Sequence, residues 1–179
     1  MNLPNALTVS RIALVPMLAA ALLAENLNAA LAIFVLGMAT DILDGHIART
    51  RGLITDFGKL MDPLADKLFV GTAFVCLVLL DRLELAVVVV ILSREAAVSA
   101  LRFVASRRGV VLSANKLGKA KTTLQAITVG VLIIGDPQLA LTQLLVALTV
   151  FVTIISGMAY FFNWATASGA PGEPASSPG

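Results

Sequence analysis

Charged side chains are scarce in this sequence. They make up 13% of its 179 residues, whereas an ordinary soluble domain has about 25%. Hydrophobic residues make up 58%, and the mean hydropathy is +0.92. A soluble globule needs more polar surface than this, and disordered chains are more charged and less apolar, so both classes are excluded. The single cysteine, Cys76, excludes a disulfide framework. This composition predicts an integral membrane protein.

Long apolar segments support that prediction, because a helix that crosses a bilayer needs roughly 20 mostly apolar residues. The candidate segments cover residues 6–24, 27–45, 60–80, 84–106, 118–135 and 138–164. We therefore predict an all-α integral membrane protein, a six-transmembrane-helix bundle that forms one domain over residues 1–164. The remaining residues, 165–179, are rich in Gly, Ala, Pro and Ser and are predicted to form a disordered C-terminal tail.

The sequence also lacks a strong net charge, since the balance is only +2 and the pI is near 9.0, which argues against a nucleic-acid partner. Most cations between the segments fall in the loops after the second and fourth segments. These residues are Arg49, Arg51, Lys59, Arg107, Arg108 and Lys116. By the positive-inside rule, both loops and both termini are cytoplasmic. The absence of a recognisable targeting peptide favours a multi-pass protein of a bacterial cytoplasmic membrane.

Four aspartates lie where the second segment ends and the third begins: Asp41, Asp44, Asp62 and Asp66. The spacing within each pair places both members on one helix face. Because the two helices are antiparallel neighbours, the pairs could converge at the cytoplasmic side. Asp62 has an alternative explanation as a helix N-cap before Pro63, whereas a helix C-terminus disfavours the charges of Asp41 and Asp44. Such an oxygen-rich cluster suits Mg²⁺ or Mn²⁺.

These aspartates belong to a longer pattern. Its specified positions are Asp41, Asp44, Gly45, Ala48, Arg49, Gly58, Asp62 and Asp66. The pattern resembles the signature of the CDP-alcohol phosphotransferase family, without a departure. Three further blocks, residues 2–11, 93–102 and 118–125, resemble the phosphatidylglycerophosphate synthases of that family. The family is implied to have six transmembrane helices, which matches the count made from hydropathy.

The resemblance implies an enzyme, a CDP-diacylglycerol–glycerol-3-phosphate 3-phosphatidyltransferase of phospholipid biosynthesis. It would transfer the phosphatidyl group of CDP-diacylglycerol to sn-glycerol 3-phosphate, with release of CMP. Two divalent ions, Mg²⁺ or Mn²⁺, are implied to assist in-line attack. The implied metal ligands are Asp41, Asp44, Asp62 and Asp66, and Asp66 would also be the catalytic base. A homodimer is implied as well.

The resemblance also assigns the donor site. The residues implied to bind CDP-diacylglycerol are Asn5, Thr8, Gly45, Ala48, Arg49 and Gly58. Considered alone, each glycine would be read as a packing or turn position, and Arg49 as a topological anchor. Arg11 shares a helix face with Thr8 and either binds donor phosphate or extends to the membrane interface.

Cations of the fourth and fifth segments are candidates for binding the phosphate of the acceptor. Arg94 lies well inside its segment, and Arg102 shares a helical stripe with Glu95, so an internal Glu95–Arg102 contact is the alternative. Lys119 and Lys121 open the fifth segment, where the helix dipole disfavours cations but favours a bound phosphate. The predicted phosphate ligands are Arg94, Arg102, Lys119, Lys121 and Thr122.

Three alternatives use the same residues differently. An enzyme of the same family could take another acceptor, inositol phosphate or phosphatidylglycerol. A small membrane transporter would spread its ionisable groups through the depth of the bilayer, whereas these groups gather at one face. A purely structural helical protein leaves the aspartates unexplained. The phosphatidyltransferase is therefore the preferred hypothesis.

Overall fold

The structure of the chain is a computed structural model that describes residues 3–51, 56–107 and 116–169, with the side chains of residues 6–43, 61–107 and 118–166. Over these residues, all regular elements are helices. They are α1 (Leu3–Leu23), α2 (Leu27–Arg51), α3 (Asp56–Leu79), α4 (Leu85–Arg107), α5 (Lys116–Ile134) and α6 (Ala140–Gly169). The all-α prediction is confirmed.

Several helix ends differ from those predicted. Helix α2 continues to Arg51, so His46 lies in a helix and not in a loop. Helix α3 begins at Asp56, which places Asp62 and Pro63 inside it, and the N-cap explanation of Asp62 is therefore wrong. Hydropathy marks where apolar residues stop, whereas the helical hydrogen bonds here continue through polar turns. For the same reason, α6 runs to Gly169, past the predicted end at 164, and residues 170–179 lie outside the described part.

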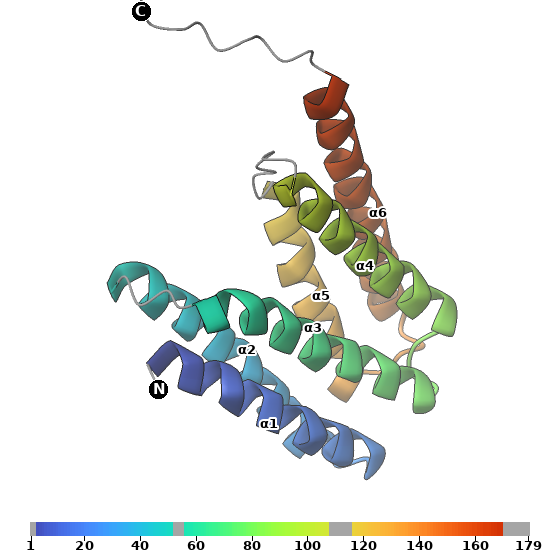
Figure 1. Ribbon diagram of the computed structural model, residues 1–179. Helices are drawn as coiled ribbons and strands as arrows, with labels where there is room; N and C mark the ends of the chain where they lie inside the picture. Colours follow the sequence, from blue (N-terminus) through green and yellow to red (C-terminus); the bar gives the residue numbers. More distant parts are fainter. Residues whose placement is uncertain (1–2, 52–55, 108–115, 170–179) are drawn as a thin grey trace, which may run out of the picture.

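The helices form two groups of three (Figure 1). In one group α1 packs along α2 and α3, and in the other α6 packs on α4 and α5. The groups are joined where α2 contacts α5 and where α3 contacts both α4 and α5. Helices α2 and α3 thus both connect the group that contains α1 to the group that contains α6.

A buried apolar core fills the contact between α1, α2, α3, α4 and α5. The rings of Phe34 and Phe69 stack in it, with centroids 5.8 Å apart and planes at 7°. Gly37, one turn after Phe34, allows this contact because a Cβ at that position would overlap the Phe69 ring. The absence of a side chain at Gly37 therefore fixes how closely α2 approaches α3.

Large apolar side chains also face outward, for example Leu141 and Phe162, which are 70% and 65% exposed. Among the described residues, two helical stretches are long and apolar enough to cross a membrane, Ala6–Leu23 and Ala140–Thr166, and Leu27–Leu43 is a shorter apolar stretch. Helices α3, α4 and α5 carry several charged residues each, which lowers their hydropathy. Six membrane spans therefore remain a prediction.

The turn after α3 gives Arg82 a structural role. Asp81 adopts a left-handed conformation with φ of 54°, and the Asp81 and Arg82 amides donate back to Val78 and Leu77. This is a Schellman-type helix end. The Arg82 Nη1 group then donates to the carbonyls of three residues at the end of α5. They are Leu132 at 3.0 Å, Ile133 at 3.1 Å and Gly135 at 3.1 Å. Arg82 therefore caps α5, where the helix dipole favours a cation.

Candidate active site

One face of α1 holds carboxylates from two other helices. Thr8 and Arg11 lie one turn apart on α1, and both are buried, with 0% and 1% exposed. The Thr8 hydroxyl donates to Oδ1 of Asp62 on α3, and Arg11 Nη1 lies 2.8 Å from Oδ1 of Asp41 on α2. The predicted convergence of the second and third segments is thus seen for Asp41 and Asp62. Of the two alternatives for Arg11, the one in which its side chain extends to the membrane interface is wrong, because Arg11 is buried.

Asp66 lies one turn beyond Asp62 on α3 and connects two groups of charges. On one side, Asp66 experiences the charges of Asp41 and Arg11, and on the other those of Lys121 and Glu95. Its carboxylate also lines a cavity among α3, α4, α5 and α6. A group at this junction can exchange a proton with a ligand in the cavity while it stays close to the other carboxylates.

The remaining predicted ligands of the metal and the donor fall outside the described side chains. These residues are Asn5, Asp44, Gly45, Ala48, Arg49 and Gly58. Among the side chains that the structure describes, no group of three or more His, Cys, Asp or Glu residues is close enough to hold a metal ion. The chemistry of the donors still fits a hard divalent cation, because carboxylate oxygens of Asp41 and Asp62 are held by one face of α1. The metal site stays a prediction.

The cavity beside Asp66 has a volume of about 520 Å³ and brings together all the predicted phosphate ligands. They are Arg94, Arg102, Lys119, Lys121 and Thr122. Lys67, whose ammonium donates to Ser99 Oγ, also lines the cavity and was not predicted as a site residue. Five cationic side chains and two carboxylates, Asp66 and Glu95, thus face the same space. The excess of positive charge favours an anionic ligand.

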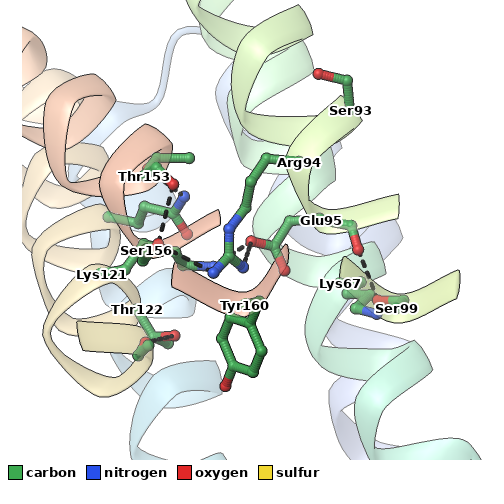
Figure 2. Close-up of polar contacts among 12 residues, drawn as sticks. Lys67, Ser93, Arg94, Glu95, Ser99, Lys121, Thr122, Thr153, Ser156 and Tyr160 are labelled. Atoms are coloured by element: carbon green, nitrogen blue, oxygen red, sulfur yellow. Dashed lines mark hydrogen bonds and ion pairs between the residues drawn. The ribbon is translucent and has the colours of Figure 1, made fainter. Parts of the chain in front are cut away.

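Glu95 is shared by two of these cations (Figure 2). Lys121, which is 5% exposed, donates to Glu95 Oε1, and Arg94 Nη1 donates to the same oxygen at 3.1 Å. Arg94 Nη2 also donates to Ser156 Oγ of α6 at 3.0 Å. Arg102 instead donates to the Tyr160 hydroxyl, so Glu95 pairs with residues other than the partner that the sequence suggested. Figure 2 shows Arg94, Glu95, Ser156 and Tyr160 gathered at one place, while Ser93 points away.

Sequence reasoning missed the contribution of α6, although a signal was present. Polar residues recur along this apolar helix at helical spacing and face polar residues of α5. Thr149 and Thr128 hydroxyls lie 2.6 Å apart, and Gln125 Nε2 donates to Thr153 Oγ1 at 3.4 Å. Such spacing in an apolar helix is typical of a helix–helix interface. The same spacing, continued for two turns beyond Thr153, leads to Tyr160, which is 2% exposed.

Comparison with known proteins identifies the family of the chain. The sequence model of the CDP-alcohol phosphatidyltransferase family matches residues 1–155. The chain belongs to this family of membrane-associated transferases. The family resemblance of the aspartate pattern is therefore confirmed.

Curated relatives within the family point to one branch of it. The chain is 40% identical to the CDP-diacylglycerol–glycerol-3-phosphate 3-phosphatidyltransferase of Bacillus subtilis, over 91% of this chain and 95% of that protein. It is 37% identical to the protein of the same name from Rickettsia felis, over 89% and 93%. It is also 38% identical to the probable phosphatidylglycerophosphate synthase of Mycobacterium tuberculosis, over 89% and 79%.

Proposed function

We propose that this protein transfers the phosphatidyl group of CDP-diacylglycerol to sn-glycerol 3-phosphate, giving phosphatidylglycerophosphate and CMP. The observation that carries this proposal is the position of Asp66, which lies where the carboxylates of α2 and α3 meet a cation-lined cavity. A phosphate-bearing acceptor in that cavity would have its hydroxyl close to a carboxylate base. The names and the extensive similarity of the relatives support glycerol 3-phosphate as this acceptor.

The chemistry is displacement at a diphosphate. The acceptor hydroxyl oxygen forms a bond to the phosphorus of the phosphatidyl group, and the bond from that phosphorus to the oxygen of CMP breaks. The hydroxyl proton passes to the Asp66 carboxylate, which acts as the general base. CMP leaves with the electron pair of the broken bond. Correct positioning of the hydroxyl supplies much of the rate enhancement in such a reaction.

The carboxylates would hold two Mg²⁺ or Mn²⁺ ions, with Asp41, Asp44, Asp62 and Asp66 as ligands. Such ions, when bound, neutralise charge on the transferring phosphates. Thr8 and Arg11 orient the Asp62 and Asp41 carboxylates through the contacts that they make in the structure. Supporting contacts of this kind commonly fix the geometry of ligands.

The donor would lie on the same side of the bundle. Asn5, Thr8, Gly45, Ala48, Arg49 and Gly58 are proposed to receive the cytidine and the diphosphate. Glycine positions permit close approach of a ligand because they lack a Cβ. Arg49 would neutralise part of the diphosphate charge.

The cavity would bind the phosphate of glycerol 3-phosphate. Arg94, Arg102, Lys119, Lys121 and Thr122 supply the donors. A phosphate dianion would balance most of the cation excess over Asp66 and Glu95. Charge-assisted hydrogen bonds from several cations also select against acceptors that lack a phosphate.

We also propose that all helices span the membrane, with the site at the cytoplasmic face of a bacterial cytoplasmic membrane and with two chains in a homodimer. The lopsided distribution of cations supports this orientation, and the bacterial relatives support the compartment. Charged residues within α3, α4 and α5 face one another across the cavity. This pairing lowers the free-energy cost of placing them inside a membrane bundle.

The test is a turnover assay on the purified protein in detergent with CDP-diacylglycerol and Mg²⁺. CMP release and the lipid product are measured with glycerol 3-phosphate, inositol phosphate, phosphatidylglycerol or no acceptor. We expect CMP release coupled to phosphatidylglycerophosphate with glycerol 3-phosphate alone. Turnover with inositol phosphate or phosphatidylglycerol in its place would assign another acceptor. No turnover with any acceptor would reject the enzyme hypothesis. The matched control is Asp66→Asn, which should release no CMP.

A further inference from the structure

Among the described side chains of α6, Tyr160 lines the cavity, and it contacts two of the cavity's arginines. The hydroxyl accepts a hydrogen bond from Arg102 Nη2, and the Arg102 guanidinium carbon lies 4.8 Å from the ring centroid. The guanidinium carbon of Arg94 lies 5.6 Å from the same centroid. The side chain is 2% exposed, so the ring is a fixed part of the wall.

The Arg94 side chain lies along the surface of α6 close to Tyr160. Ser156 Oγ accepts a hydrogen bond from Arg94 Nη2, and a Cβ on Gly157 would come within 3.1 Å of Arg94 Cγ. A Cβ on Gly118 of α5 would likewise come within 3.4 Å of the Tyr160 hydroxyl oxygen. Helices α4 and α5 therefore both approach α6 closely here, so that Arg94 of α4 lies over α6 and Tyr160 of α6 lies against the first turn of α5.

The contacts have a physical consequence for ligand binding. The face of an aromatic ring attracts guanidinium groups, and the phenol oxygen accepts a hydrogen bond from one of them. Arginine side chains are long, and an arginine that is free to move loses rotamer freedom when it binds a phosphate. Contacts that hold it beforehand reduce this loss and raise the affinity.

We propose that Tyr160 is a positioning residue for the acceptor, which holds Arg94 and Arg102 in the conformation that binds its phosphate. It acts through these arginines and not on the reacting atoms. This inference rests on the proposed function, in that a phosphate-bearing acceptor occupies the cavity. It does not depend on whether the remainder of the acceptor is glycerol.

Two substitutions separate the ring from the hydroxyl. Tyr160→Phe keeps the ring, and we expect kcat/KM for the acceptor to fall about three- to tenfold, as for loss of one hydrogen bond. Tyr160→Leu removes both contacts, and we expect a fall of about ten- to a hundredfold. The KM for CDP-diacylglycerol should stay within about twofold in both variants, as expected when only acceptor contacts change. Unaltered acceptor dependence in both variants, or equal losses for both substrates, would overturn the proposal.

A double-mutant cycle tests whether the hydroxyl acts through Arg102. If it does, Tyr160→Phe should have little further effect on acceptor use in an Arg102→Gln background. Fully additive losses would show that the hydroxyl acts independently of Arg102 and would also overturn the proposal. Because the phenylalanine substitution preserves packing, this cycle does not depend on the folding of the leucine variant.

Phe162→Leu is the matched control, since Phe162 is an exposed aromatic residue on the same helix, outside the cavity. It should leave the dependence on both substrates unchanged. Failure of the proposed function would be seen first, as absence of wild-type turnover with glycerol 3-phosphate. If the wild type uses another phosphate-bearing acceptor, the same variants measured with that acceptor decide the role of Tyr160.

Discussion

Removal of the anion or, separately, of one cation from a single ion pair can test whether the cavity binds a phosphate. Lys121 and Arg94 share the Glu95 carboxylate, whose side chain is 22% exposed, whereas the Lys121 side chain is 6% exposed. Glu95→Gln would leave both cations without their common anion. Lys121→Gln would leave Glu95 paired with Arg94 and the local charge balanced. If the cavity is built for phosphate, the two substitutions should affect ligand binding in opposite directions.

We estimate the effects from the contacts. Loss of a charge-assisted hydrogen bond costs about 1.5–3 kcal/mol. Glutamine retains an oxygen that can accept from Lys121, so we expect Glu95→Gln to lower the free energy of unfolding of the unliganded protein by about 1.5 kcal/mol, near the lower end of that range. At about 2–4 °C per kcal/mol, the thermal midpoint should fall by about 3–6 °C. A bound phosphate would replace the lost negative charge, so glycerol 3-phosphate should raise the midpoint of this variant more than that of the wild type.

Lys121→Gln should show the converse pattern. The unliganded midpoint should change little, because Glu95 keeps Arg94 as its partner. Stabilisation by glycerol 3-phosphate should be smaller than in the wild type, and kcat/KM for the acceptor should fall about ten- to a hundredfold, as for one charge-assisted hydrogen bond.

The assay is thermal unfolding in detergent with and without millimolar glycerol 3-phosphate, supported by steady-state kinetics. Arg107→Gln is the matched control, because Arg107 is exposed, lies over the Phe103 ring and is outside the cavity. It should change neither the midpoint nor the ligand shift. The reasoning predicts a larger ligand-induced midpoint shift than in the wild type for Glu95→Gln and a smaller one for Lys121→Gln. If both variants show a larger shift, both a smaller one, or neither a change, the ion pair is purely structural and the reasoning is refuted.

Three further predictions concern the chemistry and the orientation. Asp66→Asn should have a greatly lowered kcat while both substrates still bind. Steady-state kinetics and a binding assay with CDP-diacylglycerol measure these two properties, and an unchanged kcat would exclude Asp66 as the base. Chelation should abolish transfer, added Mg²⁺ or Mn²⁺ should restore it, and Asp41→Asn should fail to recover at saturating metal; recovery would exclude Asp41 as a ligand. In a Cys76→Ala background, Glu84→Cys should react with an impermeant thiol reagent in intact cells and Arg107→Cys only after the inner face is opened; the reverse labelling would invert the topology.

The helical fold and much of the site could be predicted because their signals are local. Apolar length predicts helices, and the spacing of Asp41, Asp44, Asp62 and Asp66 predicts shared faces. The five phosphate ligands predicted from α4 and α5 do line one cavity. Helix ends were less accurate, because polar turns beyond the apolar stretch remained helical, as at Asp62.

Contacts between distant helices could not be predicted in the same way. Arg11 pairs with Asp41 and Thr8 bonds Asp62 only because α1 packs on both α2 and α3, which no local pattern specifies. Tyr160 lies in an apolar run of α6, and its hydroxyl contacts Arg102 of α4, a helix that is far away in the sequence. Its polar neighbours on α6 recur at helical spacing, but that spacing alone does not distinguish a packing interface from a ligand site.

The central claim is that one cavity places a phosphate-bearing acceptor next to the Asp66 base. An experimental structure of the full-length protein with glycerol 3-phosphate bound tests it most directly. The phosphate should accept hydrogen bonds from cations of α4 and α5, among them Arg102 and Lys121, and a terminal hydroxyl should lie about 3 Å from the Asp66 carboxylate. A phosphate bound outside this cavity, or a hydroxyl with no path to Asp66, would contradict the claim.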